Sequence, residues 1–184
     1  SLQFKNGVPV SLNNEALSPA QLIIKLNKIA GDNAIGRIDI MEDRMMGLKV
    51  RENYECPGSV VLLKAHQALE NLVLTRDEIR FKKTVDLEWS KLAYEGLWWD
   101  PFKTDLECFI QKTQERVTGE VKLKLFKGQT TVLGRSSKWA LYSEDLASFD
   151  STTFDQREST GSVKNFGMQP RMFGHLAEKF KTEM

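Results

Sequence analysis

The hydrophobic periodicity changes along this chain, and the order of the changes restricts its fold more than any other feature. Residues 3–12 and 121–134 alternate apolar and polar side chains, as in a strand with one buried face. Most apolar side chains between residues 58 and 117 recur instead every three or four positions, as in amphipathic helices. Strands, then helices, then strands predict an α+β fold in which helices pack on a mixed or antiparallel sheet.

Two dipeptides predict tight turns within the strand-like segments. Asn6-Gly7 separates residues 3–5 from residues 8–12, and Lys127-Gly128 follows the strand that starts after Gly119. Asn and Gly tolerate the positive φ angles that a two-residue hairpin turn requires. The sequence therefore predicts one hairpin around Asn6-Gly7 and a second around Lys127-Gly128.

Capping residues predict where the helices begin. Ser18-Pro19 begins the first, which Gly31 ends, Gly58 lies near the start of the second, Thr75 caps the third and Asp100 the fourth. The third and fourth helices carry apolar stripes that are expected to be buried: Phe81, Val85, Trp89, Leu92 and Ala93 on the third, and Phe102, Leu106, Phe109, Ile110, Thr113 and Val117 on the fourth. A loop is expected over residues 150–161, which are rich in Ser, Thr and Asp.

Composition disfavours several classes of partner. The chain has 184 residues and a net charge of +1, which gives no field that attracts nucleic acid or an anionic membrane surface. No apolar run has the length of a membrane span. Cys56 and Cys108 lack a pairing or metal-binding spacing and are expected to be reduced thiols, which favours a cytoplasmic location.

Other candidate sites have simpler interpretations. His66 and Glu70 lie four residues apart on a predicted helix, but a lone pair of this kind is more often a hydrogen-bonded histidine than a metal site. Trp98-Trp99 follows a helix-ending Gly96 and is expected to cover the helix end rather than to stack a ligand. The sequence contains no phosphate-binding loop and no nucleophile elbow, so neither chemistry is assigned.

The lysines of the last strand-like region form a basic strip. Its members alternate with apolar residues, and they are Lys122, Lys124 and Lys127. That alternation is typical of the solvated face of a strand, so a nucleic-acid patch is not favoured.

The run GRIDIMEDRMMGLKVRENYECPG, residues 36–58, is the most unusual segment. It begins as a strand in which Ile38 and Ile40 alternate with Arg37 and Asp39, continues as an extended or turn segment, and carries an exceptional number of ionisable groups. Two interpretations remain open on residue chemistry alone. The ions pair with each other at a strand end, which that chemistry favours. Alternatively, carboxylates and a phenol form a pocket wall that binds a zwitterionic amino acid.

The spacing of this run resembles the C-terminal, synthetase half of the argininosuccinate synthase family. The matching positions are Gly36, Arg37, Asp39, Glu42, Arg44, Gly47, Lys49, Arg51, Tyr54, Glu55, Pro57 and Gly58. Further matches extend the resemblance from about residue 4 to residue 149, and include Ala65-His66, Tyr94-x-Gly96-x-Trp98 and Thr113-Gln114-Glu115. Val50 and Glu52 depart from the Ser and Gly that are usual at their positions.

The resemblance implies an ATP-dependent ligase of arginine biosynthesis and the urea cycle. Such an enzyme joins citrulline and aspartate into argininosuccinate and releases AMP and pyrophosphate. It implies that Glu42 and Tyr54 bind citrulline. ATP with Mg would be bound mainly by an N-terminal domain whose pyrophosphate loop has no counterpart here, so the chain is expected to contain no catalytic residue and to be inactive alone.

The resemblance also suggests a division of the chain. Residues 1–164 are expected to form the synthetase domain, and residues 165–184 a C-terminal arm or helix that takes part in a homotetramer. Met172, Leu176 and Phe180 would give that arm an apolar side. The alternative is a non-catalytic oligomerisation or assembly module.

Overall fold

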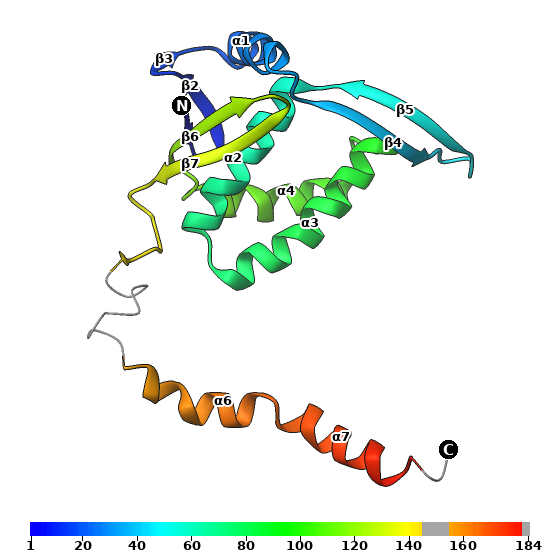
Figure 1. Ribbon diagram of the computed structural model, residues 1–184. Coiled ribbons are helices and arrows are strands. Elements are labelled where there is room, and N and C mark those ends of the chain that lie inside the picture. Colours follow the sequence, from blue (N-terminus) through cyan, green and yellow to red (C-terminus); the bar gives the residue numbers. More distant parts are fainter. Residues whose placement is uncertain (145–154, 182–184) are drawn as a thin grey trace. The chain divides into compact units, whose positions relative to one another are not determined.

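A computed structural model describes residues 1–144 and 155–181 (Figure 1). The chain divides into two compact units, residues 1–141 and residues 142–184. None of the described helices has the length and apolar character needed to cross a membrane.

The first unit contains a five-stranded sheet in the order β3-β2-β1-β6-β7, in which all neighbours are antiparallel. The strands are β1 (Leu2–Lys5), β2 (Val8–Leu12), β3 (Glu15–Ala16), β6 (Gly119–Phe126) and β7 (Gln129–Ser136). Both predicted turns are confirmed, because Asn6, Gly7, Lys127 and Gly128 all have positive φ. The N-terminal strand thus pairs with a strand from the other end of the unit, which closes the domain.

Helices α1 (Pro19–Asp32), α2 (Pro57–Val73), α3 (Arg76–Tyr94) and α4 (Pro101–Gln114) complete the first unit. The predicted caps are confirmed: Ser18 and Thr75 form capping boxes, and Asp100 accepts a hydrogen bond from the amide of Phe102. The fold is therefore α+β, as the periodicity predicts.

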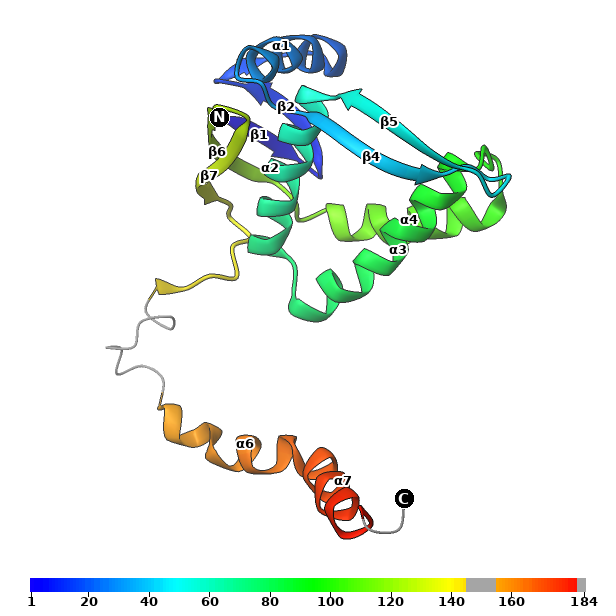
Figure 2. The same cartoon turned by 45° about the vertical axis from the view of Figure 1, so that its right-hand side comes forward.

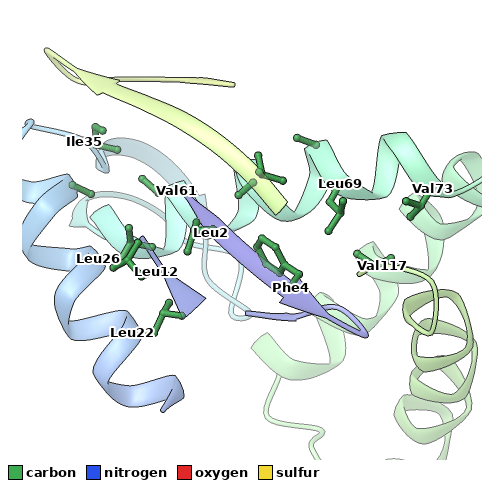
Figure 3. Close-up of a cluster of buried hydrophobic side chains, with 14 of the residues drawn as sticks. Leu2, Phe4, Leu12, Leu22, Leu26, Ile35, Val61, Leu69, Val73 and Val117 are labelled. Atoms are coloured by element: carbon green, nitrogen blue, oxygen red, sulfur yellow. The ribbon is translucent and has the colours of Figure 1, made fainter. Parts of the chain in front are cut away.

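The core lies where α1 and α2 pack on the sheet (Figure 3). Its largest fully buried side chains come from the sheet, from α1, from α2 and from the segment before β6. They are Leu2, Leu22, Leu26, Leu69, Val61, Val73, Val117 and Val121. Burial of one such leucine contributes roughly 2 kcal/mol, so these contacts fix the relation of α2 to the sheet. The segment between α1 and α2, residues 37–55, therefore starts and ends at a well-packed part of the core.

The prediction of buried apolar stripes on α3 and α4 is wrong in part. Val85, Leu92, Thr113 and Val117 are buried, but Phe81 and Phe102 are 58% and 48% exposed. The physical reason is that α3 and α4 pack mainly on each other, with Phe81 edge-on to Phe109. Their outer sides therefore lack the sheet that covers α1 and α2.

Strands β4 (Arg37–Asp43) and β5 (Lys49–Glu55) form a separate antiparallel hairpin. Figures 1 and 2 show it projecting from the α1–α2 junction toward the end of α3. The hydroxyl of Tyr94, at the end of α3, lies 3.5 Å from the carbonyl oxygen of Asp43. The hairpin is thus anchored at its base and touches the helices near its tip.

The second unit contains a short 3₁₀ helix, η1 (Gln156–Ser159), followed by α6 (Thr160–Phe166) and α7 (Met168–Lys179). The loop predicted for residues 150–161 is wrong over residues 156–161, while residues 150–154 lie outside the described part of the chain. Met172, Leu176 and Phe180 are 59%, 51% and 40% exposed, so their apolar side is largely uncovered within the unit.

Gly36 and Gly47 provide a test of what fixes the hairpin. Both have positive φ, but a Cβ on Gly36 would lie 2.5 Å from the backbone of Pro57, whereas a Cβ on Gly47 would meet nothing within 4 Å. We expect Gly47→Ala to cost about 1 kcal/mol of unfolding free energy through φ strain alone. Gly36→Ala should cost about 2 kcal/mol more, because backbone must also move. Urea unfolding of both variants measures the difference, and equal losses would contradict this account.

Candidate functional site

The register of the hairpin separates its side chains into two faces. Ile38 lies opposite Tyr54, Ile40 opposite Glu52, and Glu42 opposite Val50, so alternation places these six residues on one face. We call this the site face. The residues between them, from Arg37 to Asp43 and from Lys49 to Glu55, form the opposite face.

The opposite face is a row of cross-strand ion pairs. Arg51 binds Asp39 through two hydrogen bonds of 2.9 and 2.6 Å, and Lys49 binds Asp43 at 2.7 Å. The paired guanidinium lowers the pKa of Asp39 below its usual range. The interpretation of mutually paired ions therefore holds for this face, whose exposed pairs contribute little stability each.

Glu42 and Tyr54 lie together on the site face. The Tyr54 hydroxyl donates a 2.6 Å hydrogen bond to Oε1 of Glu42. The Glu42 side chain is 17% exposed and Tyr54 is 45% exposed, so both are accessible at the surface and neither is sealed in the core. The carboxylate bond, followed by desolvation, raises the pKa of Tyr54 above its ordinary value.

Arg44 and Glu52 complete the polar part of this face. The guanidinium of Arg44 donates a hydrogen bond to Glu52, and its Nη1 lies 3.9 Å from Oε1 of Glu42. By sequence, Arg44 is a position that matches the family and Glu52 is a departure from it, but neither residue was assigned to the site. Register, which only the structure supplies, brings them beside Glu42.

This arrangement can bind a small polar ligand. The carboxylate of Glu42 can accept from an ammonium, ureido or amide N–H, and the phenol of Tyr54 can donate or accept. Ile38 and Ile40 lie beside them with 38% and 42% of their surface exposed, so apolar contact is also available. One surface can contact only one side of a ligand, however, and enclosure requires groups from another surface.

The other predicted features have structural partners. His66 bonds Gln114 at 2.8 Å and lies 3.8 Å from Glu70, and no cluster of three or more metal-binding side chains occurs among the described residues. Glu70 also pairs with the buried ammonium of Lys82 at 3.2 Å. His66 and Glu70 therefore belong to a hydrogen-bond network that joins α2 to α3 and α4.

The expectation that Trp98-Trp99 covers the end of the helix is wrong for Trp99, while Trp98 packs against side chains of α3 and α4. Trp98 lies over the buried ammonium of Lys103, 4.1 Å from ring centroid to nitrogen, and edge-on to Trp89. Trp99 is 91% exposed and covers nothing. Lys122 and Lys124 lie on the exposed side of β6, as the alternation predicts.

Fold and hairpin together define an α+β domain with a separate polar hairpin. Residues 1–173 match the family described as Arginosuccinate synthase C-terminal domain. The argininosuccinate synthases of Methanocaldococcus jannaschii and Methanosarcina acetivorans are 59% and 57% identical over 94% and 97% of this chain. That of Archaeoglobus fulgidus is 51% identical over 95% of it.

The chain therefore belongs to the argininosuccinate synthase family and corresponds to the C-terminal part of its members. It spans about half the length of the curated relatives it matches, 44% of the first and 45% of the second. These relatives carry the name of a ligase.

Titration of Tyr54 tests the geometry of the site face. Because the folded state raises this pKa, the hydrogen bond contributes stability below the unfolded value of about 10, and the contribution is lost as pH rises through the folded pKa. We expect Glu42→Gln to lower the Tyr54 pKa, measured by phenolate absorbance against a Tyr54→Phe reference. Asp43→Asn, one residue away on the opposite face, should leave it unchanged. An unaltered pKa in Glu42→Gln would show that the two groups do not pair.

Proposed function

We propose that the chain is the synthetase half of an argininosuccinate synthase. The complete enzyme joins citrulline and aspartate, consumes ATP and releases AMP and pyrophosphate in arginine biosynthesis, the urea cycle included. The observation that carries the proposal is the paired, accessible carboxylate and phenol of Glu42 and Tyr54 on one hairpin face. Membership of the family over residues 1–173 supports it.

Glu42 and Tyr54 bind citrulline in this proposal. The ureido group is neutral and planar and presents N–H donors together with one carbonyl acceptor. The Glu42 carboxylate accepts from those N–H groups, and the Tyr54 hydroxyl turns from Glu42 to a polar atom of the ligand. A charged hydrogen bond of this kind contributes about 1.5–3 kcal/mol.

A second lobe is required for the reaction. ATP with Mg would be held mainly by an N-terminal nucleotide-binding domain, and the same domain would make most of the contacts to aspartate. The sequence of this chain contains no Gly-x-x-x-x-Gly-Lys-Ser/Thr loop or comparable phosphate cradle. We therefore propose that the chain alone is inactive and contributes one wall of a shared pocket in the cytoplasm, since convergence of both walls is needed to align three reactants.

The decisive experiment supplies the N-terminal half of the Methanocaldococcus jannaschii relative in trans and measures argininosuccinate formation. We expect activity only with both halves present. Glu42→Gln should reduce citrulline use on the order of tenfold to a hundredfold, through loss of a charged hydrogen bond. Asp43→Asn is the matched control, since Asp43 faces the opposite side and pairs with Lys49. Equal activity of wild type and Glu42→Gln would remove the citrulline assignment.

A second candidate function, a non-catalytic oligomerisation or assembly module, is favoured by the uncovered apolar side of α7. Under the first proposal residues 1–164 are the synthetase domain and residues 165–184 are an arm of a homotetramer. Under the second, assembly is the whole function. Tetramers without activity in the complemented assay would favour the second.

The arm itself has a separate test. Leu176 is 51% exposed on α7, so its replacement should not disturb a core within the second unit. We expect Leu176→Glu to shift the chain from tetramer to smaller species in sedimentation velocity, because a charge in an apolar interface is costly. Lys179→Glu on the same helix controls for added negative charge. A tetramer that persists in Leu176→Glu would exclude α7 from the interface.

A further inference from the structure

Arg44 lies between two carboxylates but contacts them unequally. Its Nη2 donates a hydrogen bond to Oε1 of Glu52, whereas its Nη1 is 3.9 Å from Oε1 of Glu42. The second separation exceeds hydrogen-bond range. The direct partner of the guanidinium is therefore Glu52, and Glu42 contributes only attraction at a distance.

The two carboxylate oxygens of Glu42 are not equivalent. Oε1 of Glu42 accepts the Tyr54 hydroxyl at 2.6 Å, and Oε2 of Glu42 receives no hydrogen bond from the described residues. An arginine that binds a carboxylate commonly takes both oxygens at once. If Arg44 moved onto Glu42, it would compete with Tyr54 and cover the free oxygen.

The backbone holds Arg44 within reach of both carboxylates. The Arg44 amide donates to the carbonyl of Leu48, and the Gly47 amide donates to the carbonyl of Arg44, both at 2.8 Å. These bonds close the turn directly after β4. A shift of the backbone therefore cannot carry Arg44 away from the site face. Only a rotation of its side chain decides whether the guanidinium binds Glu52 or Glu42.

We propose that Glu52 is a positioning residue that binds Arg44 and so keeps it off Glu42. With Arg44 held by the β5 carboxylate, Glu42 remains free to accept from Tyr54 in the unbound chain and from the ureido group when citrulline binds. The ligand part rests on the proposed function, whereas the competition between Arg44 and Tyr54 does not.

This role differs from that of a stabilising surface ion pair. The side chains of Arg44 and Glu52 are 45% and 36% exposed, and pairs with that exposure contribute little to folding. Loss of Glu52 should therefore leave the urea midpoint nearly unchanged. Its effect should appear at Glu42 and Tyr54.

A double-mutant cycle in the 184-residue chain tests the competition. Glu52→Gln should lower the pKa of the Tyr54 phenol, because Arg44 moves onto Glu42 and displaces the hydrogen bond from Tyr54. In an Arg44→Met background, the same substitution should shift that pKa far less, because no guanidinium remains to move.

The alternative is that Glu52 acts on Tyr54 only through its own charge. The shift from Glu52→Gln would then be the same in both backgrounds, and that result overturns the proposal. So does the absence of any shift in the wild-type background. Far-UV circular dichroism and the urea midpoint confirm that each variant is folded.

The assembly with the N-terminal half tests the ligand part. Glu52→Gln should raise the KM for citrulline about tenfold with little change in kcat, since a binding contact is obstructed. Combined with Arg44→Met, it should add no further loss. An unchanged KM overturns this part. If Glu42→Gln also leaves citrulline use intact, the proposed function itself fails, and the Tyr54 titration still decides whether Glu52 positions Arg44.

Discussion

The close approach of Gly36 to the peptide between Cys56 and Pro57 joins the hairpin to the core. The Cys56 amide donates to the Gly36 carbonyl at 2.9 Å, and the Gly58 amide donates to Oδ1 of Asn27 in α1 at 2.8 Å. Strand β4 therefore starts, and strand β5 ends, at the contact between α1 and α2. The rigidity of that contact sets the direction in which Glu42 and Tyr54 face, although neither touches the core.

Features that depend on neighbouring residues in sequence could be predicted. The Asn6-Gly7 turn and the caps at Ser18 and Thr75 are local chemistry, and each occurs as expected. The exposure of Phe81 and Phe102 was not predictable, because a helical stripe shows that a face is apolar and not what covers it. The helical α6 was missed for a related reason, since its composition suits a loop equally well.

For the site, the resemblance named Glu42 and Tyr54, and the structure adds how they are held. A twelve-residue separation does not imply contact, and only the register of β4 on β5 brings the phenol to the carboxylate. The same register explains why the charges of this run have two roles. Asp39 and Arg51 pair on one face. On the other face Arg44 binds Glu52 and lies close to Glu42.

The hairpin is a sheet of two strands, so each strand has an outer edge without a strand partner among the described residues. Such edges invite pairing with another chain and can seed aggregation. Charged residues occupy alternate positions along both strands, including Arg37, Asp39, Lys49 and Arg51. A second hairpin approaching edge to edge would have to desolvate these groups. The row of cross-strand ion pairs thus protects the projecting, partly apolar hairpin from self-association while the chain folds.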